Sequence, residues 1–347
     1  MSIPTRLQKV RKLMSIQGLD SLLVSSREDI FYYTGYKTPE GNLLVIQNSG
    51  SPSLFVSPLD NDAEKVKGIN LTYFKKGEDL TKLLKSQNVG YDENNLVARR
   101  FLNLHKHQIR LKKSSALIKQ PREIKDDQEI ESIKKAISIT KNVLEKTNFY
   151  NRKEIDVANK IEAQFKLHGS DKSFDTIVCN GSASIHHIPD STKIKSSRPT
   201  IFDLGARYNW YCCDVTRTYL GASGKYWKKI WEDVKEMQDE ITEFVKPGIT
   251  MEELQSIYIK LSGKKKYKVH HYFGHGLGLG VHEQITGKLK ENMVITVEPG
   301  VYLNSGSHKS LANSSGSMFC SAGGVRIEDT ILVRKGRPIV LSKSIKY

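Results

Sequence analysis

Cysteine and long apolar runs are both scarce in this chain of 347 residues. The four cysteines are too few and too irregularly spaced for a disulfide framework or a zinc ribbon. No apolar run approaches the ~20 residues that a membrane-spanning helix needs. The opening residues, MSIPTRLQKVRKL, also lack the apolar core and the small-residue cleavage site of a signal peptide. We therefore expect a cytoplasmic protein that makes no contact with a membrane.

Acidic residues are outnumbered, since 54 Lys and Arg face 38 Asp and Glu and give a formal net charge of +16. Such a charge is compatible with nucleic-acid binding. However, the basic residues are dispersed, runs such as residues 264–266 are short, and no helix-turn-helix, finger or RNA-binding signature accompanies them. A solvated basic surface is the better interpretation, and specific binding of nucleic acid is not expected.

The first third of the chain has the pattern of a small α/β domain. An apolar stripe follows Thr5 and Gln8, which have the spacing of a capping box, and Gly18 marks the end of the expected helix. Short β-like runs then occur at residues 21–26, 42–47 and 53–56. The length of the chain allows two domains, and we place the first over residues 1–118.

The remaining residues, 119–347, have the pattern of a larger α+β domain. It opens with a long amphipathic helix that has an acidic start at Asp126. Further helices are predicted over residues 155–168, 228–245 and 251–262. Strands and glycines dominate the segments between and after these helices. Two halves of this kind suggest an internal pseudo-repeat, although the similarity between them is faint.

Two aspartates of this second domain lie close to a predicted hairpin. Asp203 follows the apolar run 200–202, and Asp214 lies eleven residues later, within the β-like run 211–219. An odd spacing on one strand would place the two side chains on opposite faces. Gly205 and the polar residues after it predict a hairpin instead, which allows both carboxylates to face one pocket.

Three further candidate ligands occupy short glycine-containing segments, namely His275 in FGHGLGLGVHE, Glu298 before Pro-Gly, and Glu328 in GGVRIED. Four carboxylates and one imidazole are the donors that two divalent cations sharing oxygens would need. Without cations, four converging carboxylates would repel one another and could not stay ionised. Taken singly, each residue also has a structural explanation, as a turn former or a hydrogen-bonding histidine, so spacing alone leaves both explanations open.

These segments, in this order, resemble the pita-bread metallopeptidases, the superfamily of creatinase, aminopeptidase P, prolidase and methionine aminopeptidase. The matching stretches are FDLGARYNWYCCDVTRT (202–218), FGHGLGLGVHE (273–283), VITVEPGVY (294–302) and GGVRIEDT (323–330). The resemblance extends to LVSSREDIFYYTGY (23–36), similar to a creatinase-type N-terminal domain, and to PREIKDDQEIESIKKA (121–136), similar to the linker helix. It implies an α+β pita-bread catalytic domain preceded by a smaller creatinase-type α/β domain.

The resemblance also implies a role for each ligand. Asp214 and Glu328 would bridge two divalent metal ions, Asp203 would complete one ion, and His275 with Glu298 would complete the other. Manganese or cobalt suits this donor set best, and zinc or iron is compatible with it. A water between the ions would attack the peptide bond, and Glu298 would carry its proton to the leaving amine.

Histidines and arginines outside the ligand set have implied roles as well. His282 would stabilise the oxyanion, and His186 would face the substrate, although His187 is an alternative in that position. Arg217 and Arg326 would hold carboxylate ligands in place.

Two departures from the family pattern concern recognition of the end of the substrate. After His282 the family often has a proline and a nearby arginine, whereas residues 284–290 of this chain contain neither. Lys288 is the nearest candidate for binding a substrate carboxylate, with His308 and Lys309 as others. His308 and Lys309 belong to an insertion over residues 304–322. This insertion is either functional or without a role in binding.

The resemblance predicts a metal-dependent Xaa-Pro dipeptidase, or prolidase, that acts on proline-containing dipeptides or short peptides and forms a homodimer. One alternative is an aminopeptidase P that acts on longer peptides. Another is a pita-bread fold retained as a non-catalytic binding module, but relatives of that kind typically lose metal ligands, and all five positions are filled here.

Overall fold

The computed structural model describes residues 3–74, 78–304 and 322–346, which form two compact units, Met1–Arg122 and Glu123–Tyr347. The division falls slightly after the expected border at residues 118/119. Pro121 and Arg122 are held by the first unit, since the Tyr32 hydroxyl donates to Pro121 O at 2.7 Å. Arg122 Nη1 lies 2.6 Å from Asp29 Oδ1 in a buried ion pair.

The first unit is built on one mixed six-stranded sheet in the order β4-β3-β2-β1-β5-β6. β1 and β2 pair antiparallel, as do β2 and β3, whereas the other neighbours are parallel. Its strands are β1 (Ser21–Val24), β2 (Leu43–Gln47), β3 (Ser53–Val56), β4 (Asn70–Tyr73), β5 (Asn88–Tyr91) and β6 (Arg110–Lys113). Its helices are α1 (Ile3–Ile16), α2 (Arg27–Thr34), α3 (Glu78–Leu84), α4 (Ala98–Lys106) and α5 (Ser115–Lys119), with 3-10 turns η1 (Asn61–Lys65) and η2 (Gln120–Arg122).

Sequence pattern accounts for most of these elements. The central strands β1 and β3 are buried along their whole length, because helices cover them and their residues are mainly apolar. The three strands expected from apolar runs are confirmed. The expected capping box is wrong, since α1 begins at Ile3 and Thr5 therefore lies inside the helix rather than at its cap.

The second unit combines several small sheets with two pairs of helices. The sheets have the orders β11-β10-β7, β12-β9-β8, β13-β16-β17 and β14-β15. The strands are β7 (Asp171–Lys172), β8 (Ile177–Asn180), β9 (Thr200–Leu204), β10 (Ala206–Tyr208), β11 (Tyr211–Cys212), β12 (Val215–Tyr219), β13 (Val294–Val297), β14 (Gly300–Leu303), β15 (Gly323–Arg326), β16 (Asp329–Leu332) and β17 (Ile339–Val340). The helices are α6 (Asp127–Glu145), α7 (Glu154–Leu167), α8 (Gly224–Phe244) and α9 (Met251–Lys264).

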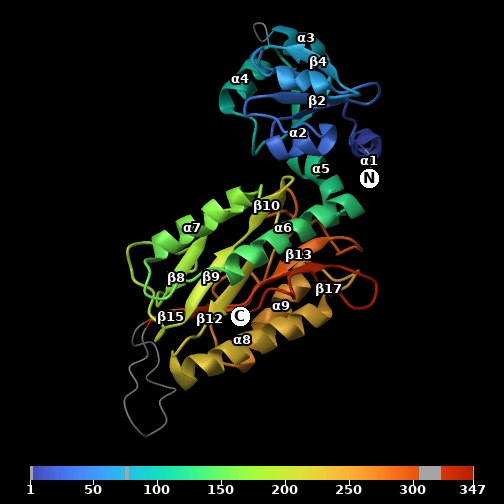
Figure 1. Ribbon diagram of the computed structural model, residues 1–347. Helices are drawn as coiled ribbons and strands as arrows, with labels where there is room; N and C mark the ends of the chain where they lie inside the picture. The colour runs from blue at the N-terminus through green and yellow to red at the C-terminus, as the bar shows by residue number, and fades with distance from the viewer. Residues whose placement is uncertain (1–2, 75–77, 305–321, 347) are drawn as a thin grey trace. The chain divides into compact units, whose positions relative to one another are not determined.

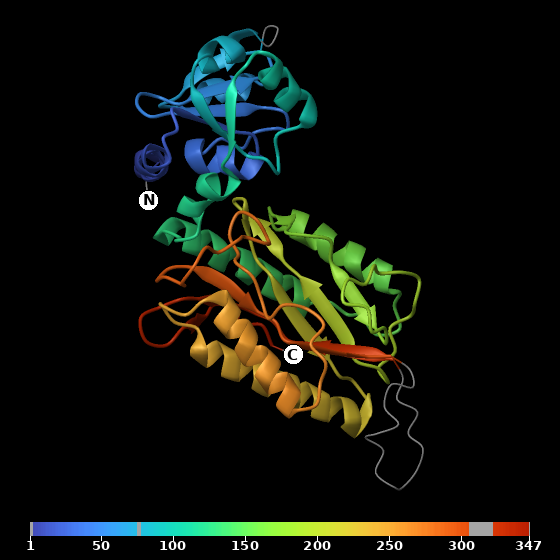
Figure 2. The same ribbon diagram turned by 180° about the vertical axis from the view of Figure 1, so that it is seen from behind.

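The helices of this unit lie outside the strands. Helix α6 packs with α7 and α8 packs with α9, and the strands lie between these two pairs (Figures 1 and 2). Helix α6 starts at a complete capping box, in which the Asp126 and Glu129 side chains each accept from the other residue's backbone N–H. The apolar faces of α8 and α9 close a core against β13 and β15. The predicted helices and the α+β class are confirmed.

The hairpin predicted between the two aspartates is also present. β9 and β12 pair antiparallel, with Leu204 opposite Val215. A Cβ atom at Gly205 would lie 1.7 Å from Cys213 O, so only glycine allows the chain to pass so close at this point. The hairpin therefore brings the ends of β9 and β12 to the same place.

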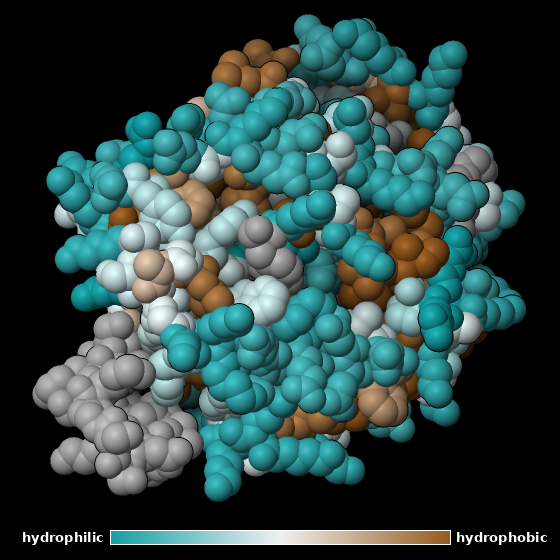
Figure 3. Space-filling model, turned by 60° about the horizontal axis from the view of Figure 1, so that its bottom comes forward, coloured by the Kyte–Doolittle hydropathy of each residue, from teal (hydrophilic) through white to brown (hydrophobic). Residues whose placement is uncertain are grey.

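Hydrophobic side chains appear in small separate patches on the face shown in Figure 3, which is mainly hydrophilic. In the part of the chain that the structure describes, no helix is both long and apolar enough to cross a membrane.

Candidate active site

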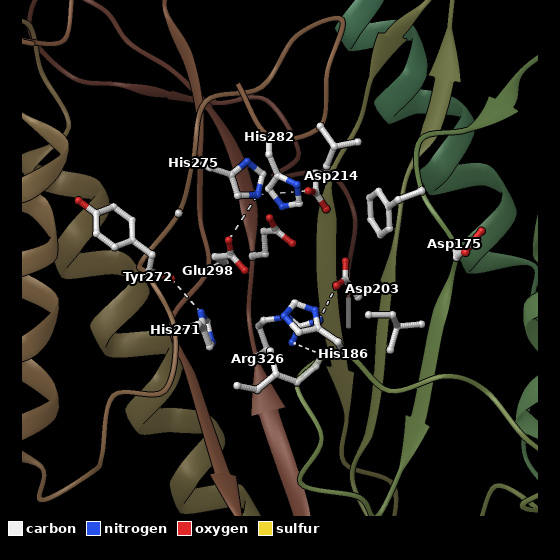
Figure 4. Close-up of a pocket in the computed structure, with 16 residues that line it drawn as sticks. Asp175, His186, Asp203, Asp214, His271, Tyr272, His275, His282, Glu298 and Arg326 are labelled. Carbon is white, nitrogen blue, oxygen red and sulfur yellow. Dashed lines mark hydrogen bonds and ion pairs between the residues drawn. The ribbon is translucent and has the colours of Figure 1, made fainter. Parts of the chain in front are cut away.

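A cavity of about 510 Å³ opens in the second unit. All five predicted metal ligands line it, together with both predicted substrate-side histidines, His186 and His282 (Figure 4). The five are Asp203, Asp214, His275, Glu298 and Glu328. The structure thus brings together five ligands that span 126 positions of the sequence, from Asp203 to Glu328 (328 − 203 + 1).

Strand pairing places the carboxylates. Asp203 lies on β9 opposite Thr216 on β12, and Asp214 directly precedes β12. Glu328 stands between β15 and β16, where its backbone N–H donates to Thr216 O at 3.1 Å. The Thr216 hydroxyl donates to Glu328 Oε2 at 2.9 Å, which fixes one oxygen of this carboxylate. Three carboxylates therefore meet around the start of β12.

The glycine-rich segment brings the imidazole to the same cavity by running beside β13. Thr296 N–H donates to His275 O at 2.8 Å, and Glu298 N–H donates to Phe273 O at 2.7 Å. Nε2 of His275 lies 3.5 Å from Asp214 Oδ2 and 3.4 Å from Glu298 Oε1 (Figure 4). Ligand atoms of Asp214, His275 and Glu328 all lie within 4.8 Å of one another.

Burial dominates the electrostatics of this cluster. It raises the pKa of the Asp214 and Glu328 carboxyls well above their usual range, and repulsion from neighbouring carboxylates adds to the effect. Burial also raises the pKa of Glu298 to about 8. It lowers the pKa of His275 to about 4, so this imidazole is neutral at physiological pH and has a lone pair available.

These residues fit divalent cations. Asp203 Oδ1 and Glu328 Oε1 are buried oxygens with no hydrogen-bond partner among the described residues. A buried oxygen that lacks a donor is costly unless another positive group binds it. Carboxylate oxygens with one neutral imidazole are the donors that such cations prefer.

Two buried arginines contact the residues of this cluster. Arg326 pairs with Asp203 Oδ2 and donates to the Tyr302 hydroxyl at 2.8 Å. Arg217 donates to the backbone O of Glu328 at 2.5 Å and to Asp329 Oδ1 at 2.8 Å. Arg217 thus holds the backbone of Glu328 in place.

The two adjacent histidines that sequence could not separate have different surroundings. His186 lines the cavity, whereas Nε2 of His187 lies 2.6 Å from Oε2 of the buried Glu154. On the opposite wall, the rings of His275 and His282 meet edge to face with centroids 4.3 Å apart. Lys288 is exposed, and its backbone forms an isolated antiparallel β-bridge with Thr250. It is not among the described residues that line the cavity.

Several lining residues were missed by the sequence analysis. His271 lies 3.1 Å from the Tyr302 hydroxyl through Nε2, and burial lowers its pKa to about 4. Phe174, Ile177 and Val281 supply apolar walls. Single apolar residues and a histidine outside regular secondary structure have no periodic signal that could have identified them. Residues 305–321 of the expected insertion over 304–322, with His308 and Lys309, lie outside the described residues.

Comparisons with known proteins agree with this geometry. The family model of metallopeptidase family M24 matches residues 131–335, and that of the creatinase/prolidase N-terminal domain matches residues 6–124. The Xaa-Pro dipeptidase of Pyrococcus furiosus is 33% identical over 98% of this chain and 98% of its own length.

Solved structures show the same likeness. The prolidase of Pyrococcus horikoshii superimposes with a TM-score of 0.88 at 31% identity, over 99% of this chain and 100% of that one. An X-Pro aminopeptidase of Thermotoga maritima has a TM-score of 0.83 at 25% identity, over 97% of each chain. The resemblance and the fold that it implied are confirmed. The chain belongs to metallopeptidase family M24 and carries a creatinase/prolidase N-terminal domain.

Proposed function

We propose that this enzyme hydrolyses the Xaa-Pro bond of dipeptides. The observation that carries the proposal is the buried cluster of four carboxylates and one neutral imidazole, in which Asp203 Oδ1 and Glu328 Oε1 lack a donor among the described residues. Full-length similarity to proteins named Xaa-Pro dipeptidase supports the choice of substrate.

The cluster would hold two divalent metal ions. Asp214 and Glu328, whose ligand atoms lie within 4.8 Å of that of His275, would serve both ions, while Asp203 would bind one and His275 with Glu298 the other. Manganese or cobalt suits this mixture of hard oxygens and one imidazole. When bound, such cations polarise the scissile carbonyl and make water acidic enough to be a nucleophile near neutral pH.

Glu298 is the proton carrier in this proposal. Its carboxyl lines the cavity beside His275, and as a ligand of a bound cation it would be ionised and so able to take up a proton. It would accept the proton of the attacking water and pass it to the proline nitrogen as that nitrogen leaves. A proton must reach this nitrogen, since an amide anion is too basic to leave.

The histidines orient the substrate. His282 stands against the His275 ring, where it would donate to the oxygen of the scissile carbonyl as negative charge develops there. His186 would contact the substrate from the facing wall. Arg326 contributes by holding Asp203 in place through their buried ion pair.

An Xaa-Pro aminopeptidase that accepts longer peptides is the second candidate. One observation favours it: Arg326 is the sole lysine or arginine among the described residues that line the cavity, and it is already bound to Asp203 and Tyr302. A dipeptidase needs a donor for the free carboxylate of proline. Lys288, which is exposed and lies off the cavity, would have to move to serve.

Matched substrates decide between the two candidates. Metal-depleted protein is reloaded with manganese or cobalt and assayed on Xaa-Pro, Xaa-Pro-amide and Xaa-Pro-Xaa, with Xaa-Leu as the control for proline specificity. We expect kcat/KM to be highest for the free dipeptide, with modest discrimination, because lysine lacks the bidentate fork of arginine. Equal cleavage of acid and amide would favour the aminopeptidase, and cleavage of Xaa-Leu alone would refute both.

The homodimer and the cytoplasmic location stay predictions. Sedimentation velocity at several protein concentrations tests the first, and fractionation of the source cells tests the second.

A further inference from the structure

We propose that Lys125, which lies outside all the metal-site segments, is a positioning residue that holds His282 in the cavity by way of Glu283. This inference rests on the proposed function for the role of His282. Its structural part concerns only how residues 276–283 are held, and that part can be tested without any substrate.

Lys125 forms a buried ion pair with the residue that follows His282. Its Nζ lies 3.1 Å from Glu283 Oε2, and the two side chains are only 3% and 9% exposed. The same Nζ donates to Glu123 O at 3.2 Å. Lys125 N–H donates to Asn292 O at 2.9 Å, which fixes the lysine backbone next to the start of β13.

Glu283 in turn closes the glycine-rich segment into a compact loop. Its backbone N–H donates to Gly276 O at 2.8 Å and its carbonyl accepts from Gly276 N–H at 3.1 Å. Its carboxylate accepts from Gly280 N–H through Oε1 at 3.1 Å. A Cβ atom at Gly278 would lie 2.6 Å from Glu283 Oε2, so the carboxylate packs directly on the loop backbone.

His282 depends on this loop for its orientation. Among the described residues its ring packs against the His275 ring and has no hydrogen-bond partner, so the backbone sets where the ring points. The loop is also held on its far side, where Glu123 Oε1 accepts from the Thr286 hydroxyl at 2.6 Å and from its N–H at 3.1 Å. The segment 123–125 therefore holds the chain at two points directly after His282, namely Glu283 and Thr286.

A charge that is buried in this way needs its partner. Removal of Lys125 would leave the Glu283 carboxylate with less compensation inside the protein, and this carboxylate would then turn toward water. Movement of Glu283 would release Gly280 N–H and shift the neighbouring His282. If the ion pair were purely structural, its removal would lower the stability of the protein by the same amount whichever residue stood at position 282.

A kinetic double-mutant cycle separates these two roles. We expect Lys125→Met to lower kcat about tenfold in the wild-type background and less than threefold in His282→Ala, with KM little changed. Lys125→Arg, which keeps the charge, should recover most of kcat. Lys265→Met is the matched control, since Lys265 makes a largely buried ion pair with Asp233, 2.9 Å away, and neither residue lines the cavity. The control should leave kcat within twofold of wild type.

Equal losses of kcat for Lys125→Met in both backgrounds would overturn the proposal, because Lys125 would then act independently of His282. If Lys125→Met does not fold, the double variant Lys125→Met with Glu283→Gln removes both buried charges and takes its place in the cycle, with the same expected result.

Hydrogen exchange gives a readout that does not need catalysis. In Lys125→Met, the amides of residues 276–283 should exchange at least about tenfold faster, while peptides from α8 and α9 stay protected. Unchanged exchange in this segment would refute the positioning role even in an active enzyme. Absence of Xaa-Pro hydrolysis by the wild-type protein would instead refute the proposed function and leave this exchange result standing.

Discussion

Buried carboxylates occur in both units, but they are satisfied in different ways. In the first unit, Asp29 is fully buried, and its carboxylate pairs with Arg122 and accepts from the hydroxyl of Ser26, the N-cap of its helix. In the second unit, Asp214 and Glu328 are as deeply buried, and the ring next to them is a neutral imidazole. Asp29 has its counter-charge inside the chain, whereas the cavity carboxylates together have more negative charge than their neighbours balance.

The difference distinguishes a structural acid from a functional one. A carboxylate that has a cation and hydrogen-bond donors in place contributes to stability. Carboxylates that repel one another and keep unbonded oxygens lower stability until a cation arrives, and the fold around them must tolerate that cost. The degree of burial does not separate structural from functional carboxylates, but the groups that are bonded to each carboxylate do.

The largest effect is expected from changes in the cavity. Glu298→Gln should lower kcat at least a thousandfold, about 4 kcal/mol of transition-state stabilisation, because glutamine cannot carry the proton. Asp214→Asn should do the same by removing a shared ligand. Neither change should destabilise the metal-free protein. Steady-state kinetics under saturating manganese measure kcat, and thermal unfolding of the metal-free protein measures its stability. Either variant retaining more than a tenth of wild-type kcat would show that the assigned role is wrong.

Arg122→Met is the opposite case and should affect stability alone. Asp29 would be left buried without its cation, which costs about 3 kcal/mol. We expect the first transition of urea unfolding to move to lower concentration, with kcat per folded enzyme kept. A kcat that fell as far as the stability would contradict the separation of structural and functional acids.

His282→Ala should have an intermediate effect on chemistry. Loss of one donor to the developing oxyanion lowers kcat about a hundredfold, or about 2.7 kcal/mol. Metal content should stay as in wild type, since His282 lies beside His275 and is not assigned as a ligand. Calorimetric titration that showed the loss of one metal would make His282 a ligand instead.

The smallest effect concerns pH. The folded metal-free chain keeps a proton on Glu298 up to about pH 8, whereas the unfolded chain releases it near its ordinary pKa of 4.5. The folded state thus binds more protons in this window, so stability falls as pH rises through it. The Tm of the metal-free protein should fall by a few °C between pH 6.5 and pH 8.5. The drop should be smaller in Glu298→Gln, and a drop of the same size would exclude Glu298 as its source.

Sequence predicted the parts of the site that depend on regular structure. The apolar run before Asp203 and the polar turn after it predicted a hairpin, and pairing of β9 with β12 is local enough for such a pattern to specify. The family resemblance implied that Arg326 holds a carboxylate ligand, and only the structure gives Asp203 as its partner.

Other features depend on contacts that no local pattern encodes. The distinction between His186 and His187 depends on Glu154, which lies at the start of α7 and 33 positions before His187 (187 − 154 = 33). Lys288 was chosen because it is near His282 in sequence, but the chain turns away between the two at Gly287, which has φ +71°. Position along an irregular segment is thus a poor guide to direction in space.

Gly205 has no chemistry of its own, yet its position limits how this sequence can vary. Any side chain there would meet Cys213 O at 1.7 Å, where no rotamer and no small shift of a flexible neighbour relieves the overlap. In a library of all single substitutions selected for growth on a proline dipeptide, position 205 should tolerate as little change as Asp203 or Asp214. Variants lost at 205 should also be missing from the soluble fraction, because they fail before the metal site is assembled.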